Sequence, residues 1–80
     1  MTHTILRLPA VKAATGLSRS TIYLRIADGV FTKPVSLGGR AVGWPSSEVV
    51  ALLGARVAGK SDAEVRTLVA TLETGRKSAA

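Results

Sequence analysis

The segment from Gly16 to Gly29 has the sequence GLSRSTIYLRIADG and carries the signals of a short helix at both ends. Ser18 is a favoured N-cap residue, because its side-chain oxygen can accept a hydrogen bond from an exposed backbone N–H of the first turn. Gly29 suits the left-handed conformation that commonly closes a helix. We therefore predict a helix over residues 19 to 28.

A shorter helix is predicted immediately before it. Pro9 is tolerated in the first turn of a helix. Val11 and Ala14 supply apolar positions, and Gly16 ends the helix. Residues 1 to 7 are expected to form an extended lead-in. Two short helices joined by a tight turn form the helix-turn-helix pattern.

Two short segments on either side of Gly38-Gly39 predict a two-stranded hairpin, or wing. They are VSL at 35–37 and RAVGW at 40–44. Paired glycines accept the positive φ angles that a tight hairpin turn requires. Trp44 shares one strand face with Val42, which predicts a core position for its ring.

Apolar residues at helical spacing predict a third helix after the hairpin. Pro45 with Ser46 or Ser47 is expected to begin it, and Gly59 to end it. Its apolar set should close the core. The members of this set are Val49, Val50, Leu52, Leu53 and Val57.

A fourth helix is predicted from a capping box, in which Ser61 and Glu64 can exchange hydrogen bonds between side chain and backbone. It should run to about Glu73, and residues 75 to 80 are expected to be a flexible tail. One apolar stripe at helical spacing follows the box. This stripe either caps the domain or mediates self-association, and it consists of Val65, Leu68, Val69 and Leu72.

These elements predict a mainly α fold with a small β-hairpin. We assign residues 1–59 to a winged helix-turn-helix domain and residues 60–74 to an amphipathic C-terminal helix. A single short helix contacts only a few base pairs, so useful specificity on DNA usually needs two or more copies. We therefore favour cooperative self-association on double-stranded DNA through the stripe of the fourth helix.

The composition is that of a small, strongly basic protein. Eleven Lys and Arg against five Asp and Glu give a net charge of +6, which favours binding to nucleic acid. The chain has no cysteine, so disulfides and thiolate metal sites are excluded. No apolar run approaches the roughly 18 residues of a membrane span, and the N-terminus is unlike a secretion signal. We expect a cytoplasmic, nucleoid-associated protein with no membrane partner.

The helix over residues 19–28 has a narrow apolar side at Ile22 and Ile26 and a broad polar side. Arginine can pair with guanine in the major groove, hydroxyls can bind bases or phosphates, and apolar groups can contact the thymine methyl. The alternative interpretation is a solvent-exposed amphipathic helix in which the Ser and Thr residues serve only to cap the helix. The predicted DNA-contacting residues of this segment are Ser18, Arg19, Ser20, Thr21, Tyr23, Leu24 and Arg25.

Cations of the hairpin favour the DNA-binding interpretation. Arg40 adjoins the glycine pair and is expected to enter the minor groove, while Lys33 precedes the hairpin and is expected to bind phosphate. For Tyr23 two roles stay open, since its ring can lie on the core while its hydroxyl reaches a phosphate.

Four motifs follow one another along the chain. They are R-L-P-x-V from Arg7, T-G-L-S-R-S-T-I-Y from Thr15, G-x-F-x-K-P-V-x-L-G-G-R-A-V-G-W from Gly29 and S-E-V from Ser47. Together they resemble the AlpA family of phage and mobile-element regulators, which is related to MerR-like winged helices and excisionases. The resemblance implies a DNA-binding protein that controls excision of an integrated element, as a recombination directionality factor or a transcriptional activator, with an integrase as a candidate partner.

The chain departs from the family pattern at three places. Members often carry Pro at the place of Thr32, Trp at that of Leu52, and Arg-Leu where this chain has Leu24-Arg25. These differences imply a looser approach to the hairpin, a different core packing and a different base preference.

No enzyme, cofactor or metal site is predicted. His3 is the single histidine, and the five acidic residues are scattered, mostly at helix ends. Gly38-Gly39 lacks the Lys and Ser or Thr that follow in a phosphate-binding loop. Two other functions stay open: the DNA-recognition module of a phage small terminase-like packaging protein, and a protein-interaction adaptor that uses the stripe of residues 65 to 72.

Overall fold

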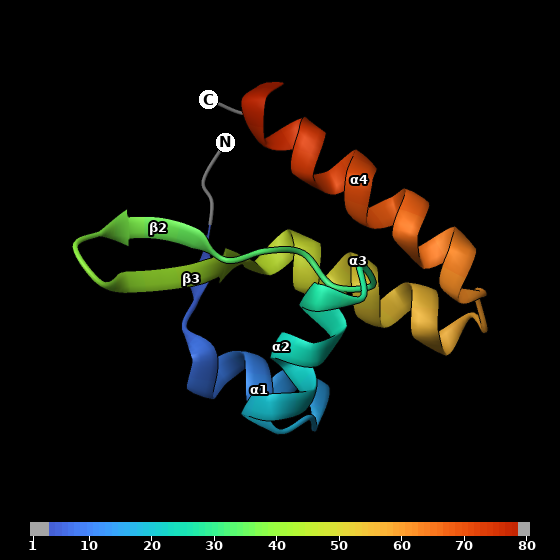
Figure 1. Ribbon diagram of the computed structural model, residues 1–80, viewed down its shortest axis with the longest axis horizontal. Coiled ribbons are helices and arrows are strands. Elements are labelled where there is room, and N and C mark those ends of the chain that lie inside the picture. Colours follow the sequence, from blue (N-terminus) through green and yellow to red (C-terminus); the bar gives the residue numbers. More distant parts are fainter. Residues whose placement is uncertain (1–3, 79–80) are drawn as a thin grey trace.

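The computed structural model describes residues 4–78, and these form four helices and a small sheet whose hairpin projects away from the helices (Figure 1). The mainly α fold with a hairpin wing and an additional C-terminal helix is confirmed. In chain order the elements are β1 (Ile5–Leu6), α1 (Leu8–Thr15), α2 (Arg19–Ala27), β2 (Val35–Gly38), β3 (Ala41–Pro45), α3 (Ser46–Val57) and α4 (Asp62–Ser78).

The two short helices have the predicted local signals at their ends. Gly16 follows α1 with a φ of 71°, and Gly29 follows α2 with a φ of 80°. The Ser18 side-chain oxygen accepts a hydrogen bond from the Thr21 backbone N–H at 3.2 Å, which confirms the N-cap of α2. The helix ends one residue earlier than predicted, because Asp28 is its C-cap.

The sheet has three antiparallel strands in the order β1-β3-β2, one strand more than the sequence predicts. The lead-in supplies the third strand, since Ile5 pairs with Pro45 and Leu6 with Trp44. At the hairpin tip Gly38 and Gly39 have φ angles of 104° and 55°, so the predicted turn is confirmed. A short extended lead-in on one side and a tight turn on the other thus hold β3 in the centre of the sheet.

Trp44 occupies the middle of the core, as predicted. Its side chain is fully buried, its ring meets that of Phe31 edge-on at 6.4 Å, and its indole N–H donates to the Thr32 carbonyl at 2.9 Å. Thr32 is fully buried as well, and its hydroxyl has no partner among the described residues. The segment that leads into the hairpin is therefore fixed by the core at Thr32, the position at which members of the resembled family often carry proline.

The prediction that the whole apolar set of α3 closes the core is wrong for two of its members. Val49 and Leu52 are buried, but Val50 is 68% exposed and Val57 is 89% exposed. Helical spacing places these two valines on the side of α3 that no other described element covers. The start of α3 agrees with the prediction, since the helix begins at Ser46 directly after Pro45. The Ser46 backbone N–H donates to the Thr4 carbonyl, and no side chain caps the helix.

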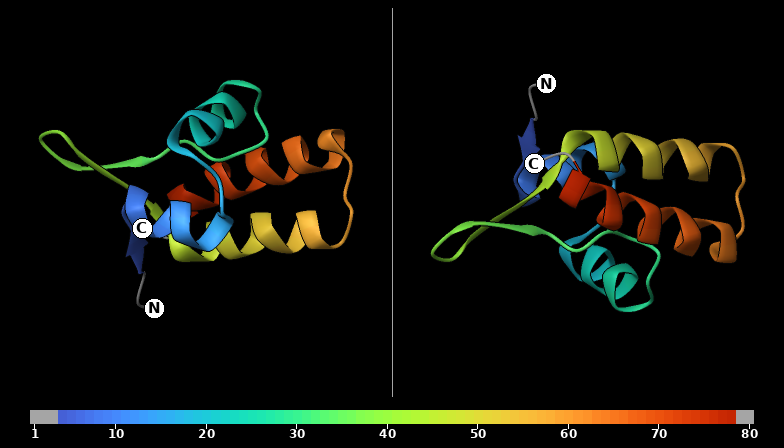
Figure 2. Two further views of the ribbon diagram at one scale, coloured as in Figure 1. Left: turned by 90° about the horizontal axis from the view of Figure 1, so that it is seen from below. Right: turned by 90° about the horizontal axis from the view of Figure 1, so that it is seen from above.

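The apolar stripe of α4 packs inside the molecule. Val65 and Val69 are 1% and 6% exposed, and Leu68 and Leu72 are half-buried against the same core. Figure 2 shows α4 lying alongside α3. The prediction of self-association through this stripe is therefore corrected: its side chains already contact their own chain, which is the domain-capping alternative.

The C-terminal segment is helical where a flexible tail is predicted. α4 continues through Gly75 to Ser78, and residues 79 and 80 lie outside the described part. Arg76 anchors this extension, since its Nε and Nη2 donate to the Glu48 carboxylate at 2.7 and 2.6 Å. This ion pair between α3 and α4 explains why the last turns stay ordered.

The predicted capping box of α4 is confirmed. The Ser61 backbone N–H donates to the Glu64 carboxylate at 3.1 Å, and the Glu64 backbone N–H donates to the Ser61 hydroxyl at 3.2 Å. The bond from the Ser61 N–H, with smaller contributions from the Ser61 hydroxyl and from Lys60, lowers the pKa of Glu64 from its ordinary value of 4.5.

This capping box predicts a specific acid sensitivity. Because the folded-state pKa of Glu64 is lowered, its contribution to stability is present above pH 4.5 and is lost as the pH falls through the folded-state pKa. Glu64→Gln keeps the cap geometry without the charge, so its stability should change less over this pH range. Urea denaturation of both proteins between neutral pH and pH 3 tests this, and parallel losses would contradict it.

Candidate nucleic-acid interface

α2 and the β2–β3 hairpin lie toward the same side of the molecule. Both views in Figure 2 place α2 and the hairpin tip on one side and α3 and β1 on the other. Ile22 anchors α2, since its side chain is fully buried in the core, and Ile26 is half-buried beside it. The opposite side of α2 is therefore presented outward, with Ser20 exposed and Leu24 61% exposed.

Tyr23 contacts both the core and the start of α2. Its ring meets that of Trp44 edge-on at 6.4 Å, while 38% of the residue remains exposed. The Arg19 guanidinium carbon lies 5.6 Å from the centre of the Tyr23 ring, in range of a cation–π interaction. The ring therefore lies on the core, as one of the two open roles requires, and it also positions Arg19.

Two of the hydroxyl groups at the start of α2, those of Ser18 and Thr21, are hydrogen-bonded to each other. Ser18 and Thr21 side-chain oxygens lie 3.0 Å apart, in addition to the cap bond from the Thr21 N–H. Ser18 is exposed, but its oxygen is occupied in holding the helix end. Ser18 therefore holds the first turn of α2 in place, and with it the exposed backbone N–H groups of that turn.

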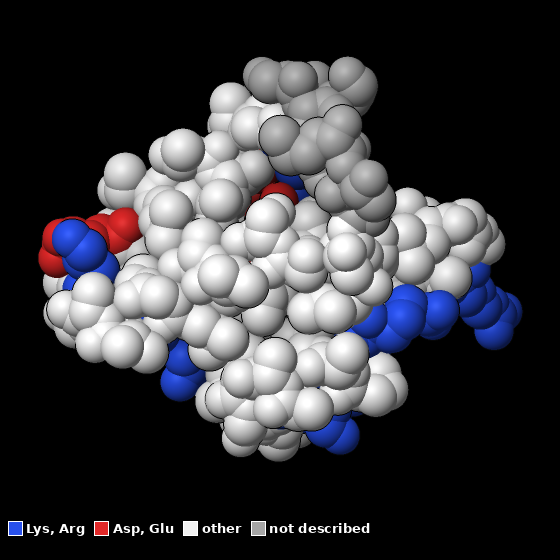
Figure 3. Space-filling view, turned by 180° about the vertical axis from the view of Figure 1, so that it is seen from behind, with Lys and Arg blue, Asp and Glu red and all other residues white. Residues whose placement is uncertain are grey.

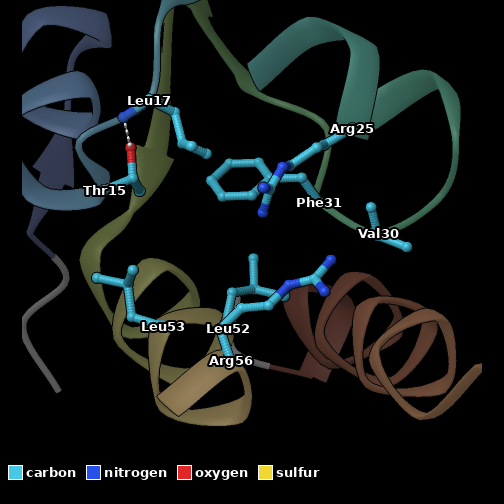
Figure 4. A pocket seen from close by; sticks show the side chains of 8 residues that line it. All are labelled: Thr15, Leu17, Arg25, Val30, Phe31, Leu52, Leu53 and Arg56. Carbon is cyan, nitrogen blue, oxygen red and sulfur yellow. Dashed lines mark hydrogen bonds between the residues drawn. The ribbon is translucent and has the colours of Figure 1, made fainter. Parts of the chain in front are cut away.

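Arg25 lies apart from the most exposed residues of α2. This residue is half-buried and lines a pocket of about 240 Å³ between α2 and α3. Figure 4 shows its side chain beside Phe31, with Arg56 of α3 on the other side of the pocket. Arg25 thus lies on the flank of α2 and not in the outward row with Ser20 and Leu24. The helical spacing of α2 gives the angle of Arg25 around the helix axis. That this side of α2 lines a pocket depends on where α3 packs, which the sequence of α2 does not show.

The hairpin and its approach present two cations. Arg40 is exposed in the turn between β2 and β3, and Lys33 is exposed just before β2. The backbone of Lys33 is fixed by α4, since its N–H donates to Glu73 at 2.9 Å and its carbonyl accepts from Arg76 at 2.6 Å. Sequence patterns miss this role of α4, because the partners are 40 or more residues apart and carry no local signal.

Charge is divided unevenly along the chain. Residues 1–47 hold six Lys and Arg against one acidic residue, a net +5, whereas residues 48–80 hold five against four. Ion pairs among the described side chains all lie in α3, α4 and their connection: Arg56–Asp62, Lys60–Glu64 and Arg76–Glu48. In the rear view of Figure 3, acidic atoms lie near one edge, together with basic atoms, and in the middle, while further basic atoms lie along the lower margin.

This division leaves the cations around α2 and the hairpin without an acidic partner. The Glu48 ion pair also raises the pKa of Arg76 above its ordinary value, through the hydrogen bonds that the carboxylate accepts. Within the described residues no ion pair involves any cation of the N-terminal half. Those cations are Arg7, Lys12, Arg19, Arg25, Lys33 and Arg40.

Residues 4–57 match the family model described as prophage CP4-57 regulatory protein (AlpA). The chain belongs to the AlpA family. The resemblance seen in the sequence motifs is thereby confirmed, and the matched span of this family of prophage regulators contains α1, α2, the hairpin and α3 but not α4.

A protein of Enterobacteria phage P4, "Uncharacterized protein ORF88", is 53% identical to this AlpA-family chain over 55 residues. The alignment covers 69% of this chain and 62% of the phage protein, which is less than two thirds of that protein's length. No solved structure matches the chain. Within residues 4–78, no helix has both the length and the apolar character that crossing a bilayer requires.

Proposed function

We propose that this AlpA-family protein is a DNA-binding regulator that places α2 in the major groove with the hairpin beside it. The observation that carries the proposal is the common orientation of α2 and the hairpin tip in the half of the chain with a net charge of +5 (Figure 2). An α-helix fits the major groove of B-DNA, and unpaired cations on the same side attract its phosphates.

The geometry favours a distinct role for each group. Arg19 and Ser20 are exposed at the start of α2 and Thr21 is half-buried beside them. These three would contact base edges, with the exposed Leu24 available for a thymine methyl. Arg25, on the helix flank, fits a phosphate better than a base. The remaining contacts would be Tyr23 and Lys33 to phosphates and Arg40 to the minor groove.

The biological role that we propose is control of excision of an integrated element, as a recombination directionality factor or as a transcriptional activator. Family membership supports a regulatory role in a phage-type element. An integrase is the proposed protein partner for the first of these roles, and the nucleoid the proposed place of action. We assign no catalytic step or cofactor. The adaptor alternative loses its surface, because the stripe of residues 65 to 72 is packed on the core.

Two substitutions on the proposed interface should have different effects on DNA binding. Arg19→Ala is expected to relax sequence preference at one position by about 1–3 kcal/mol, because a base contact is lost. Lys33→Ala should weaken binding to all sequences alike and lower the salt slope by about one, because a phosphate contact is lost. Selection from random duplexes measures the first effect, and fluorescence anisotropy over a salt series measures the second.

Lys60→Ala is the matched control for Lys33→Ala. It removes the same charge from the α3–α4 connection, far from α2 and the hairpin, where Lys60 pairs with Glu64. Its DNA affinity should stay close to that of the parent protein. Equal losses in the two lysine variants would show that net charge alone attracts DNA and that the proposed interface is misplaced.

A further inference from the structure

The pocket of about 240 Å³ between α2 and α3 has a mainly apolar wall. Its residues come from the end of α1 and the turn after it, from α2 and the segment that follows, and from α3 (Figure 4). Thr15 also lines it, but its hydroxyl is already occupied, since it donates to the Val11 carbonyl at 2.7 Å and accepts from the Leu17 N–H at 3.2 Å. The apolar wall consists of Leu17, Val30, Phe31, Leu52 and Leu53.

Two arginines supply the charge of this pocket. Arg25 comes from α2 and Arg56 from α3, and Figure 4 shows both side chains extending into the space between the two helices. Among the residues 4–78, no acidic side chain lines the pocket and Arg25 forms no ion pair. Arg56 pairs with Asp62 at 3.0 Å, where the two side chains are 35% and 63% exposed. Exposed pairs are weak, so Arg56 retains donors for a second anion.

This combination of groups indicates the chemistry of a ligand. A guanidinium is a planar fork of N–H donors that binds a carboxylate through two parallel hydrogen bonds. Cations of one sign beside a low-dielectric wall concentrate anions in the cleft. A bare inorganic anion would satisfy the two arginines but leave the apolar wall without a contact. A carboxylate with an apolar body contacts both parts of the pocket.

The volume limits the size of that body. Sites for drug-sized ligands have roughly 300–1,000 Å³, and this pocket is smaller. An acid with a single ring or a branched aliphatic chain is therefore the size class that fits. A ligand of about ten non-hydrogen atoms is expected to bind with a Kd on the order of millimolar.

We propose that this pocket binds a small amphipathic carboxylate and that binding weakens the hold on DNA. The apolar body lies against Phe31 and the leucines of the wall, and the carboxylate accepts hydrogen bonds from Arg25 and Arg56. Arg25 belongs to α2 and is the residue assigned above to a DNA phosphate. A bound carboxylate occupies its donors and adds a negative charge on the flank of α2, so the two anions compete.

The two parts of this proposal have different foundations. Ligand binding depends only on the pocket of the free protein. The effect on DNA rests on the proposed DNA binding. Because coupling between two sites is reciprocal, DNA should lower the affinity for the carboxylate by the same factor by which the carboxylate lowers the affinity for DNA.

Titration with phenylacetate, followed by backbone amide NMR, tests the pocket. The signals of Leu17, Phe31 and Leu53 should shift together and saturate. Phenylacetamide has the same ring without the charge, and inorganic phosphate has the charge without the ring, so each should bind at least about tenfold more weakly. Constant ionic strength, set with sodium chloride, removes general salt effects.

Arg56→Gln is the variant for this test, because Arg56 lies outside the proposed DNA interface. It should bind phenylacetate about tenfold more weakly, since a charged hydrogen bond is lost. Lys60→Gln is the matched control: it removes one cation from the α3–α4 connection, and Lys60 does not line this pocket. Its phenylacetate affinity should equal that of the parent protein. Circular dichroism checks that both variants are folded.

Fluorescence anisotropy with a labelled duplex tests the effect on DNA. Near-saturating phenylacetate should lower the DNA affinity of the parent protein by about fivefold or more. At the same concentration, the affinity of Arg56→Gln should change much less, because little ligand is bound. Phenylacetamide should have no effect on either protein.

The outcomes separate the proposals. Shifts confined to the pocket, weakened by Arg56→Gln and accompanied by loss of DNA affinity, would support both parts. Absence of these shifts, or equal binding of phenylacetamide or inorganic phosphate, would overturn the carboxylate site. Binding of phenylacetate with unchanged DNA affinity would overturn the competition alone. Failure of the parent protein to bind DNA without phenylacetate would overturn the proposed function and the competition, while the NMR titration would still decide the site.

Discussion

Replacing Arg76 with alanine is expected to lower the free energy of unfolding by about 3–5 kcal/mol, the usual cost of removing one partner of a buried ion pair. The Glu48 carboxylate is 5% exposed, and Arg76 is the cation that binds both of its oxygens. Without the guanidinium a buried charge loses its partner. The Lys33 carbonyl also loses a donor, so the approach to the hairpin is loosened at the same time.

Urea denaturation followed by circular dichroism measures this effect. Arg66→Ala is the matched control on the same helix: the residue is exposed and makes a single hydrogen bond, from Nε to the Asp28 carbonyl at 3.1 Å. Arg66→Ala should lower the free energy of unfolding by no more than about 1.5 kcal/mol. Combining Arg76→Ala with Glu48→Leu should recover part of the lost stability, because no buried charge remains. Equal, small losses for Arg76→Ala and Arg66→Ala would contradict the role assigned to the ion pair.

The second large effect is expected for Trp44→Ala, which should cost about 3–5 kcal/mol. The side chain is fully buried, meets Phe31 and Tyr23 edge-on, and donates a hydrogen bond to the Thr32 carbonyl. Small domains have only about 5–15 kcal/mol of stability in total, so a large part of this variant should be unfolded at physiological temperature.

Thermal denaturation followed by far-ultraviolet circular dichroism measures this, because Trp44 is the single tryptophan and its fluorescence disappears with it. Trp44→Phe keeps part of the ring volume but leaves the Thr32 carbonyl without its donor, so an intermediate loss is expected. Val57→Ala removes apolar atoms from a residue that is 89% exposed and should leave stability nearly unchanged. A melting curve of Trp44→Ala that matches that of Val57→Ala would rule out a central role for the ring.

The outward residues of α2 could be predicted from the sequence, whereas the flank could not. Ile22 identifies the buried side, and Ser20 and Leu24 then point outward on any α-helix of this sequence. Arg25 lies about a third of a turn from that row, and whether it faces solvent or a pocket depends on the position of α3. The position of Lys33 could not be predicted from the sequence either, because its backbone is held by α4.

The sequence by itself determined the ends of α1 and α2, the hairpin turn, the capping box and the family. These features depend on interactions within about four residues, such as the Ser18 cap and the positive φ angles at the glycine pair, and such interactions are the same wherever the segment is placed. The motifs that resemble the AlpA family lie in these locally defined segments.

Only the tertiary structure decided which apolar faces are covered. Periodicity shows that α3 and α4 each have an apolar stripe, but burial depends on which element packs on it. The α4 residues Val65 and Val69 are buried by the core, whereas Val50 and Val57 of α3 remain exposed. Arg76 is helical and not frayed because Glu48, 28 residues earlier, lies within hydrogen-bond distance. No pattern along the chain shows such a contact, since it exists only after the helices have packed.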